Sequence, residues 1–413
     1  MLSGIISGIL LVIIIVSIGV GVALKKNTTS GSGSTTTSAS NTYIASPGSI
    51  PIEAQGTILD FSTWYDTTDF NLTFTDATVG RLSIIGLNST WDDNKQANIN
   101  VPALKDKWEY GTRVIRGINL GGWLSIEPFI TPSLFNQYST SQGVVDEWTL
   151  CQTLGTAKAK ATIEKHYATF VNEQTFADIQ AAGFDHIRLP YPYWAVTTYD
   201  SDPYVPQVAW RYLLRGLEYA RKYGLRINLD LHALPGSQNG WNHSGHLGQI
   251  GWLNGTDGAL NAQRSLDIHK QLTTFFAQPR YANLVTMYGL ANEPRMVDLH
   301  LPPVIAWTTS AIAVVRSSGM SNDTIIVIGD GFLGLRNWQG VLSGHEKVLL
   351  DAHQYVVFNN DQLSLAHTPK IEFACQGWAQ QTNQSMNPST GFGNFLCGEW
   401  YVEPAPSILP IFC

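Results

Sequence analysis

The chain has 413 residues, of which 14% are charged, and its formal net charge is -7 at pH 7. The charged fraction is low against about a quarter in average proteins, and a negative balance without a basic patch argues against nucleic-acid binding. With 13 Trp, 16 Tyr and 16 Phe, the composition suits a neutral, polar, ring-shaped ligand, although a large buried core also uses aromatic residues.

The chain begins with an apolar segment. Residues 2–24 contain no charge and precede Lys25 and Lys26, and the run is long enough to span a bilayer. A signal peptide is the alternative, with Gly21–Ala23 as its small-residue cleavage site, but no Lys or Arg precedes the run. We therefore expect an uncleaved transmembrane anchor over 1–26, with the positive residues on the exported side, against the usual rule.

The next two segments have no helix-like period. Residues 27–49 are rich in Ser, Thr and Gly and predict a flexible stalk. Residues 50–112 carry scattered aromatics, which predict short irregular strands or a lid-like cap. The four cysteines lack metal-ligand spacing, and one or two disulfides are expected in an exported chain. Export and glycosylation are favoured by Asn-X-Ser/Thr sequons at Asn27, Asn71, Asn88, Asn242, Asn254, Asn322 and Asn383.

From Arg113 onward, strand and helix patterns alternate. The predicted strands are 114–119, 184–189, 225–231, 284–291, 324–328, 347–350 and 394–397, with Pro190 ending the second. The predicted helices are 158–181, 208–223 (ended by Gly224), 262–277 and 302–317. This alternation predicts a parallel sheet. The length favours a (β/α)8 TIM barrel over 113–400, and the Gly117–Gly122 segment lacks the glycine spacing that a dinucleotide-binding fold needs.

Two carboxylates follow strands of this barrel. Glu293 comes after the fourth strand and Glu399 after the seventh, and catalytic groups of such barrels lie at the carboxyl ends of the strands. A pair of opposed carboxylates is what glycoside hydrolysis requires, one as acid and base and one as nucleophile or activator of water. Taken alone, Glu293 could be a helix N-terminal acid, Arg188 a buried ion-pair partner, and His232 and His353 core histidines.

Several motifs together resemble fungal exo-β-1,3-glucanases of glycoside hydrolase family 5. They cover roughly Trp91 to Trp400 and occur in the family's order. The motifs are Arg116–Leu124, Glu127-Pro128, Thr131–Phe135, Arg188–Pro190, Asp230–Gly240, Asn292–Pro294 and Gly398–Trp400.

The resemblance implies a retaining glycosidase with a role for each matched residue. Glu293 would be the acid/base and Glu399 the nucleophile, kept ionised by Arg188. Asn292 would bind the sugar 2-hydroxyl. Further residues would hold the terminal glucose (Glu127 and His232), surround the reacting centre (His353 and Tyr355), or clamp the next sugar (Trp241 and Phe358). His243 replaces an Asn found in some members, which leaves the detail of its subsite open.

The pattern departs from the family after Trp400. The family continues there with the last helices and an eighth strand, whereas Tyr401–Cys413 is an atypical tail. We therefore expect a barrel truncated after strand seven, with Cys375 unpaired because its family partner lies in the missing part.

The expected function is release of glucose from the non-reducing end of β-1,3-glucans, in remodelling of the cell wall. We expect a monomeric, membrane-anchored protein with an extracellular catalytic domain, or a secreted one if the first segment is cleaved. No metal or cofactor motif is present. Transglycosylation of the same glucans and non-catalytic glucan binding by an inactive barrel remain as alternatives.

Overall fold

The computed structural model describes residues 57–58, 78–79, 82–83, 91–199, 202–356, 358 and 360–401. All of them belong to one compact unit, Ser40–Cys413. The expected anchor and stalk, and the tail beyond residue 401, lie outside these residues. Among the helices in the described ranges, none has the length and hydropathy needed to cross a membrane.

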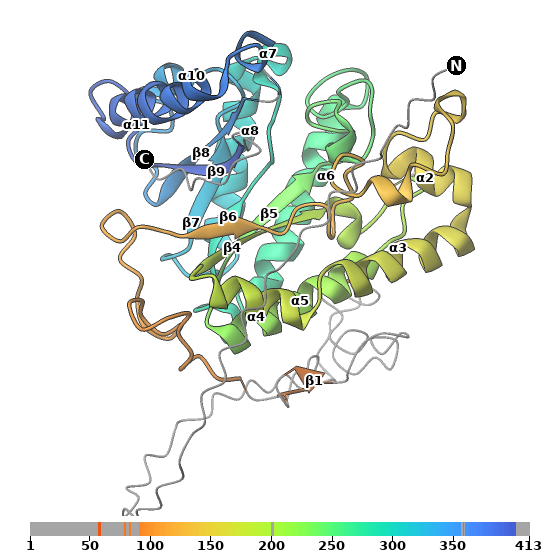
Figure 1. Ribbon diagram of the computed structural model, residues 1–413, viewed down its shortest axis with the longest axis horizontal. Helices are drawn as coiled ribbons and strands as arrows, with labels where there is room; N and C mark the ends of the chain where they lie inside the picture. The colour runs from red at the N-terminus through yellow and green to blue at the C-terminus, as the bar shows by residue number, and fades with distance from the viewer. Residues whose placement is uncertain are drawn as a thin grey trace, which may run out of the picture. The chain divides into compact units, whose positions relative to one another are not determined.

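Seven parallel strands form one sheet whose order follows the chain (Figure 1). They are β3 (Gly117–Asn119), β4 (His186–Pro192), β5 (Arg226–Ala233), β6 (Val285–Gly289), β7 (Ile325–Gly329), β8 (Val348–Tyr355) and β9 (Phe395–Tyr401). The sheet curls so that its two edge strands approach each other. Their closeness is seen in a hydrogen bond of 2.8 Å that Nδ2 of Asn119 in β3 donates to the carbonyl of Gly398 in β9. The predicted (β/α)8 architecture is therefore confirmed, with seven strands in the described part of the chain. Separately, β1 (Thr78–Val79) and β2 (Leu82–Ser83) pair antiparallel.

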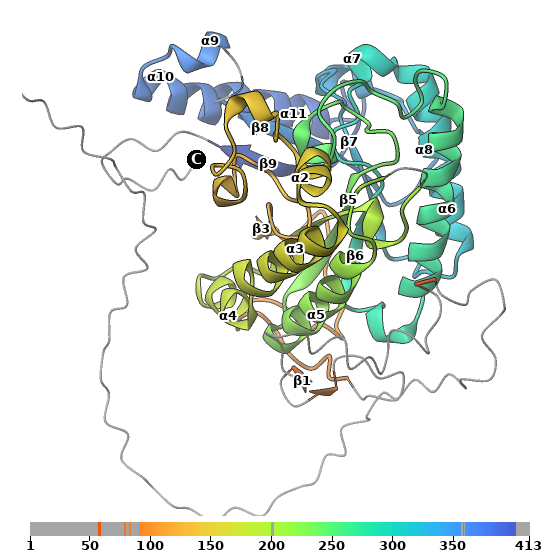
Figure 2. The same cartoon turned by 90° about the vertical axis from the view of Figure 1, so that its right-hand side faces the viewer.

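Helices follow most strands and cover the outside of the sheet. Figure 2 shows α6 and α8 side by side, and α3, α4 and α5 grouped elsewhere on the barrel wall. The α-helices are α2 (Glu147–Leu154), α3 (Thr156–Phe170), α4 (Glu173–Ala181), α5 (Val208–Tyr223), α6 (Gly258–Phe276), α7 (Met296–Leu299), α8 (Leu301–Ser317), α9 (Asn360–Leu363), α10 (His367–Glu372) and α11 (Ala379–Met386), with a π-helical stretch at Phe373–Trp378.

The helix predicted over 158–181 is in fact two helices, α3 and α4. Val171 is extended, and the next residue, Asn172, caps α4 by accepting hydrogen bonds from the backbone of Gln174 and Thr175. An Asn at this position satisfies amide groups that would otherwise lack a partner, and so it starts a new helix. The helix over 208–223 was predicted correctly. Gly224 ends it at φ 70°, where a Cβ would also lie 2.4 Å from the backbone of Gln96.

The expectation that Pro190 ends its strand is wrong, since β4 runs on to Pro192. The carbonyl of Arg188 accepts a hydrogen bond from the N–H of Leu120, so the backbone polar groups of Arg188 point toward β3. Those of Pro190, two residues later, point to the same side. Because β3 ends at Asn119, no ladder hydrogen bond is lost where the proline lacks its N–H. A proline is tolerated in a strand under that condition.

The amino-terminal end of the barrel is closed by residues 91–112. The Tyr110 hydroxyl donates to Thr286 at 2.7 Å and lies 2.9 Å from Nε2 of His186. Arg226 donates to the carbonyls of Ala103 and Asp106. These contacts lie at the first residues of β4, β5 and β6, so this segment covers the end of the barrel opposite to Glu293.

The cysteines differ from one expectation. Cys375 is disulfide-bonded, so the expectation that it would be unpaired is wrong. Cys151, which is buried in α2, and Cys397 on β9 are free thiols.

Candidate active site

The carboxyl ends of the strands bring polar side chains into the mouth of the barrel. Alternate residues of a strand point to the same side, so Asp351, His353 and Tyr355 of β8 all face inward. Below them, Met287, Ile325 and Val327 form a small apolar cluster inside the barrel. The polar layer therefore rests on a packed floor.

Glu293 follows β6, and a histidine nitrogen lies next to each of its carboxylate oxygens. Nδ1 of His353 lies 2.6 Å from Oε1, and Nε2 of His243 lies 3.1 Å from Oε2. The residue has φ 45°, in the left-handed region that non-glycine residues seldom adopt and that is enriched at active sites. Burial raises the pKa of Glu293, but the hydrogen bonds from His243 and His353 outweigh it and hold the pKa well below its usual value.

Glu399 is held by groups from two other strands, β4 and β8. Nη1 of Arg188 in β4 donates to Oε1 at 2.5 Å, and the Tyr355 hydroxyl in β8 donates to Oε2 at 2.7 Å. Nδ1 of His353 lies 3.5 Å from Oε2. Burial raises the pKa of Glu399, but the charges of His353 and Arg188 outweigh it and lower the pKa to about 2. Glu399 is therefore a carboxylate at neutral pH.

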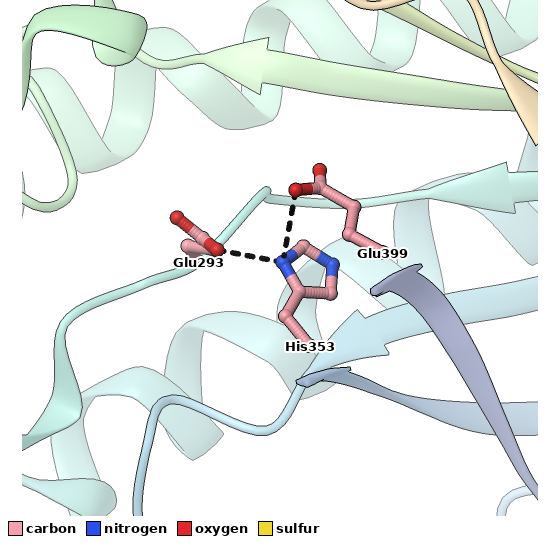
Figure 3. Close-up of side chains that lie close together, drawn as sticks. All are labelled: Glu293, His353 and Glu399. Carbon is pink, nitrogen blue, oxygen red and sulfur yellow. Dashed lines mark hydrogen bonds and ion pairs between the residues drawn. The ribbon is translucent and has the colours of Figure 1, made fainter. Parts of the chain in front are cut away.

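Figure 3 shows the His353 ring between the two carboxylates, with Nδ1 turned toward both. One carboxylate oxygen of Glu293 and one of Glu399 lie within 4.8 Å of each other. Retaining glycosidases have carboxyl groups about 5–5.5 Å apart, whereas inverting enzymes need about 6.5–9.5 Å to admit a water molecule. The separation thus fits direct attack by one carboxylate.

Arg188 also organises the neighbouring amide and histidine. Nη2 donates to Oδ1 of Asn292 at 2.7 Å and lies 3.0 Å from Oδ2 of Asp230. That same Asp230 oxygen lies 2.7 Å from Nδ1 of His232, whose Nε2 is 3.3 Å from Nδ2 of Asn292. Every polar group in this chain of contacts is buried, so the orientations of Asn292 and His232 are fixed before any ligand binds.

The remaining predicted residues lie around this centre. Burial raises the pKa of Glu127, and interactions with His232 and His243 oppose the shift. Trp241 packs edge-to-face on Phe332 with ring centroids 5.3 Å apart. Phe358 is 71% exposed, and its ring centroid lies 5.1 Å from that of Tyr355. Within the described residues the Trp241 and Phe358 rings do not contact each other, and each packs on a different neighbour.

The structure adds residues that the sequence interpretation gave no role. His243 contacts Glu293, and Phe332 packs on Trp241. Asp330 lines a small cavity beside Glu293, together with Asp230, Asn292, Asp351 and His353, and burial raises the pKa of Asp330 to about 6. Asp330 directly follows β7, so its position at the end of the fifth predicted strand is the sequence signal that points to it. Nothing in the sequence spacing indicates the contact of His243.

Glu293, His353 and Glu399 could also be considered as a metal site, because each offers one ligand atom and these three atoms lie within 4.8 Å of one another. However, Nδ1 of His353 and Oε1 of Glu293 are 2.6 Å apart, which is the length of a strong charge-assisted hydrogen bond. The arrangement therefore fits proton exchange between the two side chains better than shared coordination of a cation.

Comparison with known proteins adds three findings. A family model described as "Cellulase (glycosyl hydrolase family 5)" matches residues 151–392. Two curated relatives share the name "Probable glucan 1,3-beta-glucosidase D". The relative from Aspergillus niger is 58% identical over 364 residues, covering 88% of this chain and 44% of the relative. The relative from Aspergillus fumigatus is 57% identical over 362 residues, covering 87% and 43%. The chain thus spans less than half the length of these relatives.

Among solved structures, the crystal structure of a rutinosidase from Aspergillus niger superposes with a TM-score of 0.61 at 22% sequence identity. The superposition covers 71% of this chain and 82% of the rutinosidase chain. At this identity, the likeness concerns the fold alone.

Proposed function

The chain belongs to glycosyl hydrolase family 5, and on that premise we propose that it is a retaining glycosidase that releases glucose from the non-reducing end of β-1,3-glucans. The observation that carries the proposal is the pair formed by Glu293 and Glu399, with oxygens within 4.8 Å, bridged by one histidine. The name of the Aspergillus relatives supports the β-1,3-glucan as substrate.

Glu399 is the nucleophile in this proposal. It is ionised because Arg188 and His353 lower its pKa, and it attacks the anomeric carbon while the bond to the leaving oxygen breaks. Glu293 supplies the proton to that oxygen. It then removes a proton from the water that displaces Glu399 from the sugar, so the configuration is retained.

In the free site, the proton for the leaving group is held by His353. Burial lowers the pKa of His353, but the charges of Glu399 and Asp351 and the hydrogen bonds of Asp351 and Glu293 raise it well above 6.5. The 2.6 Å contact between Nδ1 and Oε1 of Glu293 lets that proton pass to Glu293, which then donates it to the leaving oxygen while His353 becomes neutral. Glu293 and His353 thus act as one acid.

The remaining residues recognise the sugar. Asn292, fixed by Arg188, would bind the 2-hydroxyl, a contact that strengthens in the oxocarbenium-like transition state. Glu127 and His232 would hold the terminal glucose. Trp241 and Phe358 carry exposed ring surface near the mouth, suited to stacking on the next sugar once a ligand lies between them.

The proposal extends to location. The apolar run over 2–24 and the sequons support a single-pass, glycosylated membrane protein whose barrel faces the cell wall. That the protein acts as a monomer is part of the proposal. Fractionation of cells that express the full chain tests this part. Recovery of the chain in the cytosol, without attached glycans, would contradict it.

The activity is tested with laminarin and the full chain. Proton NMR should detect β-glucose before α-glucose appears by mutarotation. Glu293→Gln and Glu399→Gln should each lower the rate by about 100-fold or more. Glu346→Gln, at an exposed position, is the matched control and should retain full activity. α-Glucose as the first product would overturn the assigned roles, and binding of laminarin without turnover by the folded chain would overturn the proposed activity.

A further inference from the structure

The inward direction of Glu399 depends on a β-bulge in β9. Ala352 pairs with Cys397, but the next residue of β8, His353, pairs with Glu399, so Gly398 is the extra residue. Side chains alternate along a strand, so a regular β9 with Leu396 facing inward would also turn Gly398 and Trp400 inward. The bulge reverses this alternation, so Glu399 faces the site and Trp400 is 65% exposed. A bulge beside an active site commonly redirects a side chain in this way.

The carboxylate of Asp351 occupies the bulge. Oδ1 accepts a hydrogen bond from the Gly398 N–H at 2.7 Å. A Cβ at position 398 would lie 2.3 Å from that oxygen, so only glycine allows the contact. The other oxygen, Oδ2, lies 3.4 Å from Nε2 of His353 and 3.8 Å from Nε of Arg188. Asp351 is 5% exposed, so water does not compete for these contacts.

We propose that Asp351 is a positioning residue, which holds the β-bulge at Gly398 so that Glu399 faces the barrel and which turns Nδ1 of His353 toward Glu293. The two carboxylate oxygens of Asp351 have different partners. Oδ1 satisfies the amide that the bulge removes from the ladder, and Oδ2 accepts from Nε2 of His353, which fixes the ring orientation. The inference rests on the proposed function only for its effect on the rate; the bulge and its contact with Asp351 are observed in the structure.

Asp351 also contributes charge to a crowded site. His353 is faced by Glu293 after β6, Glu399 on β9, Asp351 on β8 and Asp330 after β7, and Arg188 on β4 is a cation that pairs with Glu399 and Asp351. Replacing Asp351 with Asn keeps an oxygen for the Gly398 amide but removes one of the negative charges. The pKa of His353 should then fall, because Asp351 is among the groups that raise it.

Two substitutions at one position separate the two effects. Asp351→Asn should lower kcat on an aryl β-glucoside by about 10-fold and move the alkaline limb of the pH profile to lower pH, because a charge-assisted bond becomes a neutral one. Asp351→Ala removes both acceptors and should lower kcat by about 100-fold or more. Asp267→Asn, on the exposed face of α6, is the control and should change neither quantity.

A readout without substrate completes the test. Amide hydrogen exchange at residue 398, measured by NMR on the full chain, should speed up at least tenfold in Asp351→Ala and little in Asp351→Asn. The His353 ring should titrate at lower pH in Asp351→Asn. If Asp351→Ala does not fold, Gly398→Ala serves instead, since it displaces the carboxylate but keeps its charge; kcat should fall while His353 still titrates high.

The outcomes are distinct. Unchanged amide exchange at residue 398 in Asp351→Ala, or an unchanged His353 titration in Asp351→Asn, would overturn the inference. If the unsubstituted chain hydrolyses no glucan, the proposed function fails, while amide exchange and the histidine titration still decide the role of Asp351.

Discussion

Nδ1 of His353 lies 2.6 Å from Oε1 of Glu293. A hydrogen bond of this length between a buried imidazole and a carboxylate means that the two residues share one proton and titrate as a unit. We therefore propose this pair as the general acid of the site, and its pH dependence should be that of the pair.

The first prediction concerns the pH profile of kcat/KM. Activity requires ionised Glu399, whose pKa of about 2 lies below its ordinary value, so activity is present above that pH and is lost as pH falls through it. Activity also requires the proton held by His353, whose pKa is raised well above 6.5, so the alkaline limb should lie well above pH 6.5. Initial rates on an aryl β-glucoside, with circular dichroism at each pH to verify folding, test both limbs. An alkaline limb below pH 6.5 would contradict the proton-sharing pair.

The second prediction concerns Tyr355. Its hydroxyl donates to Oε2 of Glu399 at 2.7 Å, and hydrogen bonds to charged groups contribute about 1.5–3 kcal/mol. Tyr355→Phe should therefore lower kcat/KM by about 10- to 100-fold. Tyr223→Phe removes a similar bond to Glu173 at 3.0 Å, away from the site, and should leave the rate unchanged. Equal rates for the two variants would rule out a role for Tyr355 in holding the nucleophile.

The third prediction concerns His243, whose Nε2 lies 3.1 Å from Oε2 of Glu293. His243→Leu removes one of the two hydrogen bonds that lower the pKa of Glu293, so this pKa should rise. Glu293 must be ionised to act as base in the second step, so kcat on a substrate with a good leaving group should decrease at acidic pH. His243→Asn keeps a donor and should resemble the unsubstituted chain. An acid limb that does not move in His243→Leu would contradict the contact.

Much of the barrel could be predicted from the sequence, because buried parallel strands are apolar runs and their ends carry polar residues. The helix over 208–223 followed from its period and Gly224. The predicted element boundaries were wrong where one residue type occurs in two structural settings. Pro190 normally ends a strand, but here it faces an edge where β3 has already stopped, and Asn172 divides a helix whose apolar stripe looks continuous.

The site was predictable residue by residue only where a motif carried it. Contacts between strands depend on register, and no spacing rule gives the register of β8 and β9. The bulge at Gly398 turns Glu399 inward against the two-residue alternation, so pattern alone would have placed this residue outside. The contact of His243 with Glu293 likewise arises from the 3-10 helix Asn242–Ser244, which lies between β5 and α6 and has no predictable distance from Glu293 in the sequence.

The last prediction concerns stability away from the site. Glu218 on α5 is 3% exposed and accepts from Nε of Arg221 at 3.0 Å and Nε of Arg280 at 2.8 Å. Removing one member of a buried ionic group costs about 3–5 kcal/mol because the remaining charges lose their partner. Glu218→Gln should therefore lower the free energy of unfolding in urea by about that amount, while kcat of the folded protein is unchanged.

Glu173→Gln is the matched control for this prediction, because the pair of Glu173 with Lys222 is partly exposed and such pairs contribute about 0–1 kcal/mol. Burial raises the pKa of Glu218, but Arg221 and Arg280 outweigh it, so the folded-state pKa lies below the usual value. The stabilisation is then fully present above the unfolded-state pKa and is lost as pH falls through the folded-state pKa. The stability difference between Glu218→Gln and the unsubstituted chain should shrink in strong acid. A difference that stays constant with pH would mean that packing, and not charge, makes Glu218 important.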